Sequence, residues 1–171
     1  MAIDMHSASV PMMRLMLQNM LAWLDKAEAH ATARRFKPDN YLGLRLAPDM
    51  LPFSRQVQIA SDHAKGCVAR LAGVENPKYD DSESTLDELR ARIRKTLAFI
   101  DSIPADKVRG SEAREVVLPM RAGELRYTGE DYLRHFALPN FYFHCTTAYA
   151  LLRHAGVELG KVDFLGAAPR S

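Results

Sequence analysis

The sequence has few of the features that mark specialised classes of protein. It contains only two cysteines, and Cys67 and Cys145 each fall among apolar residues at helical spacing, as small buried side chains do in a reducing compartment. No apolar run approaches the length of a membrane span. The N-terminal stretch also lacks the long apolar region behind a basic one that marks a signal peptide. We therefore expect a cytoplasmic protein with no membrane partner.

An excess of charge of one sign is also missing. The 23 basic and 21 acidic residues give a formal net charge of +2, and the basic residues are not interleaved with aromatic ones as on a nucleic-acid surface. Nucleic acid is therefore not an expected partner. The length and the ordinary composition predict one domain over residues 1–171, with enough chain to bury a core.

Apolar residues at helical spacing are abundant instead. Between Val10 and Ala31 they recur at alternating steps of three and four, which predicts a long amphipathic helix over residues 10–33. A second helix is expected between Pro52, which suits a first turn, and Gly73, which suits a stop.

A third helix is predicted over residues 85–101, because Thr85 and Glu88 match a capping box ahead of an apolar stripe. The charged residues of this helix, Arg92 among them, are interpreted as a solvated face. Basic residues follow acidic ones along it, as the helix dipole favours.

The long connection before the last helix is predicted to contain a short β-hairpin. Residues 115–120 and 124–128 are β-prone and flank a turn at Arg121-Ala122-Gly123. A short helix is expected to start at Thr128 and to end near Pro139. Such a long crossover allows the third and fourth long helices to have a relative direction that a tight loop would forbid.

The last long helix carries the first candidate site. Pro139 suits its first turn, and an apolar stripe runs from Leu138 to Leu152. His144 lies beside that stripe, where a partly desolvated imidazole needs a hydrogen-bond partner or a metal. Asn140, one turn earlier, is close enough to share a ligand with it. The alternative is a satisfied core histidine. In the tail, Phe164 and Leu165 are expected to dock on the bundle.

The second helix offers further polar candidates. Gln58 and Asp62 are one turn apart on one flank of its buried stripe, and His63 lies on the other flank together with Gln56. Gln58 and Asp62 are at a spacing that lets them face a shared pocket. The alternative is that both flanks are simply solvated.

Three long phrases carry a family resemblance: LRLAPDMLPFSRQVQIASDHAKGCVARLAG, ESTLDELRARIRKT and LPNFYFHCTTAYALLRHAGVELGKVDFLG. Together with the N-terminal helix they resemble the domain-of-unknown-function family DUF1993, within the DinB/YfiT-like superfamily. The resemblance implies an all-α four-helix bundle with long connections, here with a short β-hairpin in the crossover before the last helix. No activity is established for that family, so the resemblance implies none for this chain.

In the wider DinB-like group a metal, often nickel or zinc, is held by one histidine on the second helix and an HxxxH pair on the fourth. Many metal-bearing relatives resemble thiol-dependent transferases or hydrolases. By this resemblance His144 matches the second histidine of the pair, Asn140 takes the place of the first, and Gln58 falls near the second-helix position. Because amides are weak ligands for transition metals, no tightly bound cofactor is expected. The weak alternative is a nickel or zinc site with His144 as a ligand, completed by Asp62 or His63.

Three hypotheses about function follow. The first is a bundle with a degenerate metal site that binds a small polar ligand or partner through a pocket between helices two and four, at Gln58, Asp62, His63, Asn140 and His144. The second is a metal-dependent hydrolase or thiol-dependent transferase that uses His144 with Asp62 or His63. The third is a structural dimer with a vestigial pocket. A homodimer is expected from fold analogy alone.

Overall fold

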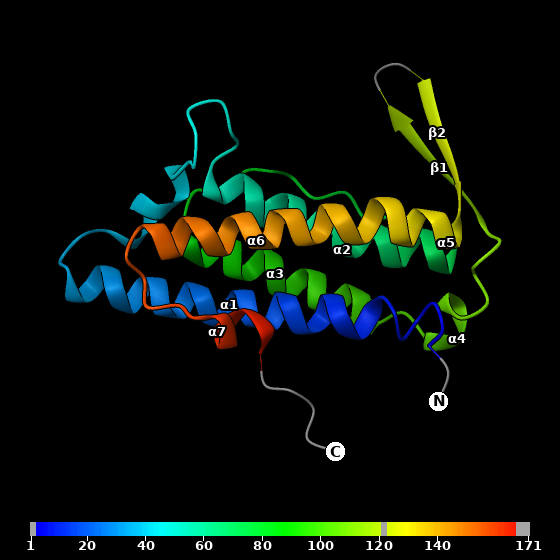
Figure 1. Ribbon diagram of the computed structural model, residues 1–171, viewed down its shortest axis with the longest axis horizontal. Coiled ribbons are helices and arrows are strands. Elements are labelled where there is room, and N and C mark those ends of the chain that lie inside the picture. The colour runs from blue at the N-terminus through cyan, green and yellow to red at the C-terminus, as the bar shows by residue number, and fades with distance from the viewer. Residues whose placement is uncertain (1–2, 121–122, 167–171) are drawn as a thin grey trace.

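A computed structural model describes residues 3–120 and 123–166. Its body is an elongated bundle of four long helices (Figure 1), which are α1 (Val10–Ala33), α2 (Phe53–Ala72), α3 (Leu86–Asp101) and α6 (Leu138–His154). Helices α1 and α2 each pack against both α3 and α6, so they occupy opposite corners of the bundle. The predicted all-α four-helix bundle is therefore confirmed. None of the helices in the described ranges combines the length and the apolar character needed to cross a membrane.

The ends of these helices follow from local sequence. The start of α2 follows Pro52, and its end is closed by Gly73, whose φ of 67° is a left-handed conformation that favours glycine. At the start of α3, the hydroxyl of Thr85 accepts from the N–H of Glu88 at 3.2 Å, and the Glu88 carboxylate accepts from the N–H of Thr85 at 3.1 Å. The predicted capping box is thus present.

The first connection is held against α3 rather than left as a free loop. It contains a short 3-10 helix, η1 (Pro38–Gly43), and Asp39 Oδ1 accepts a hydrogen bond of 2.9 Å from the N–H of Leu86. This contact satisfies one of the unpaired N–H groups at the start of α3. The connection therefore also serves as part of the α3 cap.

The predicted hairpin is present and projects from one end of the bundle (Figure 1). Strands β1 (Glu115–Met120) and β2 (Gly123–Thr128) pair antiparallel, with Leu118 opposite Leu125. The short helix α4 (Ala105–Val108) precedes them. Arg121 and Ala122, which the sequence places in the turn, lie outside the described residues.

The short helix that follows the hairpin does not end near Pro139, and that prediction is wrong. Helix α5 (Gly129–Tyr132) passes through a π-helical turn, η2 (Leu133–Ala137), directly into α6. Proline has no N–H to donate and disrupts regular α-helical bonding. The wider turn absorbs this defect, and the side chain of Asn140 donates to the carbonyl of Phe136 at 2.7 Å.

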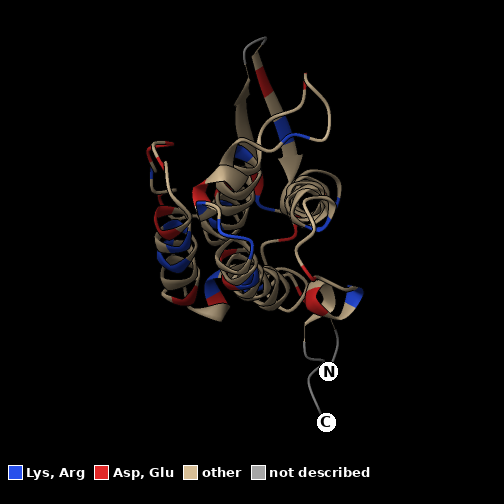
Figure 2. Ribbon diagram, turned by 90° about the vertical axis from the view of Figure 1, so that its left-hand side faces the viewer, with Lys and Arg blue, Asp and Glu red and all other residues tan. Residues whose placement is uncertain are grey.

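The tail is docked by one aromatic residue and not by two apolar ones. In α7 (Lys161–Leu165), Phe164 stacks on Trp23 of α1 with ring centroids 5.6 Å apart. Leu165, also expected to dock, is 55% exposed. The surface follows no simple charge pattern: acidic and basic residues are interspersed on the helices in the end view of Figure 2.

Candidate functional site

His144 is held in one orientation by a buried amide on the neighbouring helix. Its Nδ1 lies 2.7 Å from Oε1 of Gln56 on α2, and Gln56 Nε2 donates to the carbonyl of Leu51 at 2.9 Å. Because the amide oxygen only accepts, Nδ1 of the imidazole must carry the proton. Nε2 of His144 is therefore left as an acceptor.

His63 lies against His144 and is the more available of the two imidazoles. The two rings are nearly parallel, at 15°, with centroids 5.8 Å apart, and Phe136 borders His63 from η2 at 5.8 Å. No hydrogen bond within residues 3–120 and 123–166 uses a ring nitrogen of His63. In the same residues, the side-chain polar atom that is fully buried without a hydrogen-bond partner is Arg92 Nε, so the His63 nitrogens are not fully buried. The His63 nitrogens are therefore within reach of solvent or a ligand.

Both imidazoles are kept neutral at physiological pH. Burial, and to a lesser extent the neighbouring His144 and Arg70, together lower the pKa of His63 to about 4. Burial also lowers the pKa of His144. The pair therefore offers hydrogen-bond donors and acceptors rather than positive charge.

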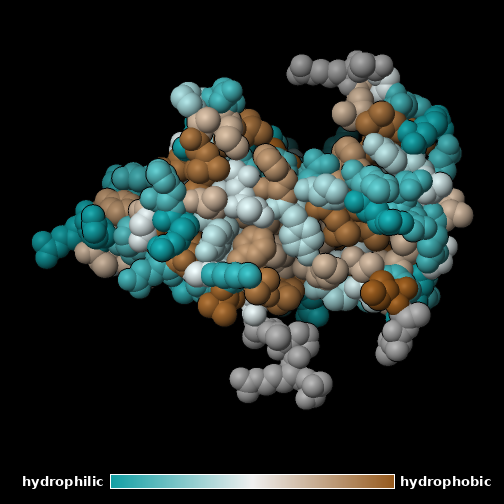
Figure 3. Space-filling view, in the orientation of Figure 1, coloured by the Kyte–Doolittle hydropathy of each residue, from teal (hydrophilic) through white to brown (hydrophobic). Residues whose placement is uncertain are grey.

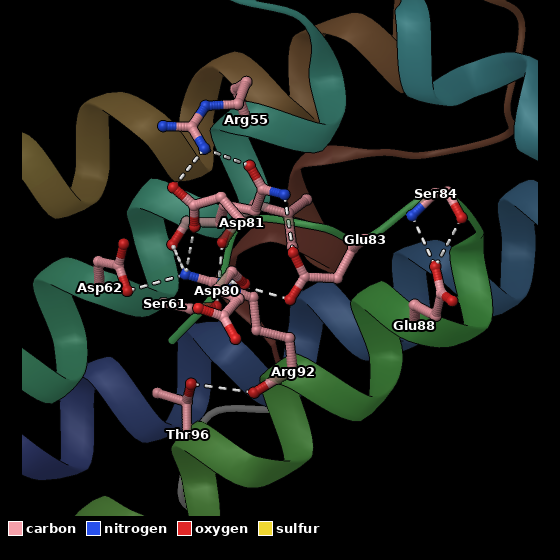
Figure 4. A network of polar contacts seen from close by, with 12 residues as sticks. Arg55, Ser61, Asp62, Asp80, Asp81, Glu83, Ser84, Glu88, Arg92 and Thr96 are labelled. Atoms are coloured by element: carbon pink, nitrogen blue, oxygen red, sulfur yellow. Dashed lines mark hydrogen bonds and ion pairs between the residues drawn. The ribbon is translucent and has the colours of Figure 1, made fainter. Parts of the chain in front are cut away.

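The structure separates Gln58 and Asp62 from this pair. Figure 4 shows Asp62 turned toward Arg92 of α3, with Arg92 Nη2 2.9 Å from Asp62 Oδ1. Gln58 is bonded on the same side, where its Nε2 donates to Glu83 at 2.7 Å and its Oε1 accepts from Arg55 at 2.7 Å. These two residues lie on the flank of α2 that faces α3, whereas Gln56 and His63 lie on the flank that faces α6.

Arg92 organises this second cluster, and its interpretation as part of a solvated face is wrong. The residue is 3% exposed, and its guanidinium pairs with Asp62, Asp81 and Glu83 and donates to the carbonyl of Asp80. Asp62 belongs to α2, whereas Asp81 and Glu83 come from the segment between α2 and α3, which has no regular secondary structure. Arg92 therefore fixes that segment onto the bundle.

A cavity of about 320 Å³ opens beside His63. We call it the His63 cavity; it is lined by Asp62, His63, Lys65, Arg70, Asn76, Leu118, Pro119, Met120 and Phe136. It lies between α2, the hairpin and η2, with His144 stacked behind the His63 ring. None of its lining residues belongs to α6, so this cavity is not the pocket predicted between the second and fourth long helices.

Of the five predicted site residues, His63 and His144 stack on each other, and Asp62 lines the His63 cavity with its carboxylate engaged by basic side chains. Asn140 lies nearby on α6, but its amide is engaged by the carbonyl of Phe136. Sequence reasoning assigned no site role to Gln56 or Arg70. Both were detectable from helical spacing, because each is seven residues from His63 and therefore on the same face of α2.

The donor set at this site does not fit nickel or zinc. In the part of the chain that the structure describes, no three histidine, cysteine, aspartate or glutamate side chains gather where a metal could be held. The carboxylate that lines the cavity, Asp62, is engaged by Arg92 and by Lys65 at 3.2 Å. Two imidazoles with no free third ligand fall short of a catalytic divalent site.

The buried neutral state of His63 makes stability depend on pH. Between about 4 and 6.5 the unfolded chain binds a proton that the folded His63 does not, so acid favours unfolding. The stability is fully present above the unfolded pKa and is lost as pH falls through this window. Allowing for the solvated part of the ring, we expect this loss to be about 2 kcal/mol. Urea unfolding across the window should show it for the wild type and a flatter profile for His63→Gln. Parallel profiles would contradict the assignment.

Comparisons with known proteins agree with this architecture. The model of a family described as "Domain of unknown function (DUF1993)" matches residues 5–165. A crystal structure of a DinB family member protein from Shewanella denitrificans is 43% identical and superposes with a TM-score of 0.91, over 97% of this chain and 94% of that chain. No protein with a curated description matches the chain.

Proposed function

This chain belongs to the DUF1993 family, and we propose that it binds a small polar molecule in the His63 cavity without the help of a transition metal. The observation that carries the proposal is the neutral imidazole of His63, whose ring nitrogens have no partner in the described part of the chain. Buried or half-buried polar groups are normally satisfied by protein, water or ligand. The cavity beside the His63 ring has a volume of about 320 Å³. This volume is at the lower end of the range for small-molecule sites.

The surroundings of His63 support binding over a purely structural role. Gln56 fixes His144, and His144 in turn stacks on His63, so the His63 ring is held in place without using its nitrogens. A preorganised donor and acceptor loses little freedom when a ligand binds. A histidine that serves only to fill a core would be expected to use these nitrogens within the protein.

The experiment is imidazole NMR on protein with labelled histidine side chains. Acetate, acetamide, ethanolamine and glycerol serve as anionic, neutral, cationic and hydroxylated probes. We expect at least one class to shift the His63 ring signals in a saturable way, while His30, which bonds Tyr41 on the other side of the bundle, stays unchanged. No saturable change with any class would overturn the proposal.

Two further arms of this experiment separate the alternatives. Near-stoichiometric nickel or zinc after dialysis against each metal, lost in His144→Ala, would favour the metal-dependent hydrolase or transferase. A His144→Ala protein that loses stability but keeps probe binding would assign His144 a structural role only. The homodimer expected from fold analogy stays a prediction, which light scattering can test. On the face of the molecule shown in Figure 3, apolar residues lie among polar ones.

A further inference from the structure

Arg70 lies in the wall of the His63 cavity and is held there by two features of the fold. Its Nη1 donates to the hydroxyl of Tyr132 at 3.1 Å, and burial raises the pKa of Tyr132, so that hydroxyl stays protonated. A β-carbon at Gly66 would collide with Nη1 and lie 3.5 Å from the amide nitrogen of Asn76. The absence of a side chain at position 66 therefore leaves space for the guanidinium beside the cavity.

The charge of Arg70 is not compensated within the described residues. None of the ion pairs found there includes Arg70. The other two charged residues of the cavity, Lys65 and Asp62, pair with each other at 3.2 Å. With His63 neutral, the lining carries one excess positive charge. A guanidinium has five N–H donors, and Tyr132 accepts from one nitrogen, which leaves donors for a bidentate acceptor.

Part of the cavity wall is apolar. Leu118, Pro119 and Met120 of the hairpin and Phe136 of η2 form it, and Met120 is 51% exposed. An apolar wall in the same cavity as a guanidinium suits a molecule with one anionic end and one hydrocarbon end. Inorganic anions would use the guanidinium but gain nothing from this wall.

We propose that the His63 cavity selects small organic carboxylates with a short apolar tail, and that Arg70 binds the carboxylate in a bidentate manner. The proposal rests on the proposed function and names its ligand class. In this arrangement the tail lies against Leu118 and Phe136, and the neutral His63 ring supplies a further hydrogen bond. Lys65 cannot replace Arg70, because its ammonium is already paired with Asp62 and hydrogen-bonded to Asn76.

The test is calorimetric titration of the full chain with hexanoate, with hexanamide as its neutral analogue, and with inorganic phosphate. We expect hexanoate to bind more tightly than the other two. Arg70→Met, which keeps an unbranched apolar stem but removes the guanidinium, should weaken hexanoate binding roughly tenfold or more, as expected for the loss of charge-assisted hydrogen bonds. Arg153→Met removes an exposed arginine from α6 and should leave binding unchanged.

A second variant keeps the proposal testable if the Arg70→Met protein does not fold. Gly66→Ala adds only a β-carbon to α2, which displaces the guanidinium of Arg70 and should weaken hexanoate binding while the helical signal persists. Equal binding of hexanoate and hexanamide, unchanged in Arg70→Met, would overturn this inference and leave the proposed function standing. Phosphate binding as tight as hexanoate binding would also overturn it. No response to these ligands or to the four NMR probes would overturn both.

Discussion

Replacing Arg92 with alanine is expected to lower the free energy of unfolding by about 3 kcal/mol, at the low end for a buried ion pair that loses one partner. The guanidinium is 1% exposed, and its partner Glu83 is 13% exposed. Asp62 and Asp81, at 37% and 36%, keep part of their hydration, which limits the loss. Oε1 of Glu83 and the carbonyl of Asp80 would lose their donor, while the other oxygen of Glu83 would keep its hydrogen bond from Gln58. The segment between α2 and α3 should therefore loosen.

Urea unfolding followed by circular dichroism measures this effect, and Arg94→Ala is the matched control. Arg94 lies on the same helix and is exposed, so its removal should change stability by no more than about 0.5 kcal/mol. Arg92→Lys should recover only part of the loss, because an ammonium lacks the planar fork that serves several acceptors at once. Equal stability of the Arg92→Ala and Arg94→Ala proteins would contradict the role assigned to the cluster.

Replacing Trp23 with alanine is expected to lower the free energy of unfolding by about 4 kcal/mol, the range for a large aromatic in a core. Trp23 is 1% exposed, stacks on Phe164 and meets Tyr149 edge-on at 5.6 Å. Its indole N–H donates to the carbonyl of Asp163 at 2.9 Å. The substitution therefore opens a cavity and releases α7 at the same time.

Circular dichroism must follow this unfolding, because Trp23 is the single tryptophan of the chain. Met12→Ala on the same helix is the control, since Met12 is 43% exposed and should contribute little. In the wild-type background, Phe164→Ala should change the fluorescence of Trp23 and Leu165→Ala should not. A Trp23→Ala protein as stable as the Met12→Ala protein would show that α7 and α1 do not form one core.

The four long helices could be predicted closely because their signals are local. The stripe from Val10 to Ala31, the proline and glycine that bound α2 and the capping box of α3 each act within a few residues. The hairpin was predictable for the same reason. The end expected near Pro139 was wrong because the π-helical turn and the Asn140 side chain together let the helix continue.

The candidate site was only partly predictable, because the direction of a polar flank is decided by the neighbouring helix. Gln58 and Asp62 match the spacing of a shared site, yet Arg92 of α3 binds Asp62, and Glu83 of the segment before α3 binds Gln58. His63 and Gln56, on the other flank, meet α6 instead. Nothing within α2 distinguishes the two flanks.

The sequence by itself determined the four long helices, most of their ends and the family, because hydrophobic periodicity and capping are properties of short stretches of chain. Only the tertiary structure decided which polar residues became internal. Arg92 could be buried because acids from another segment reach it, and Arg70 stays without an acid in the described residues because the hairpin brings apolar side chains to its cavity. A charge is buried or left available according to what the rest of the fold places opposite it.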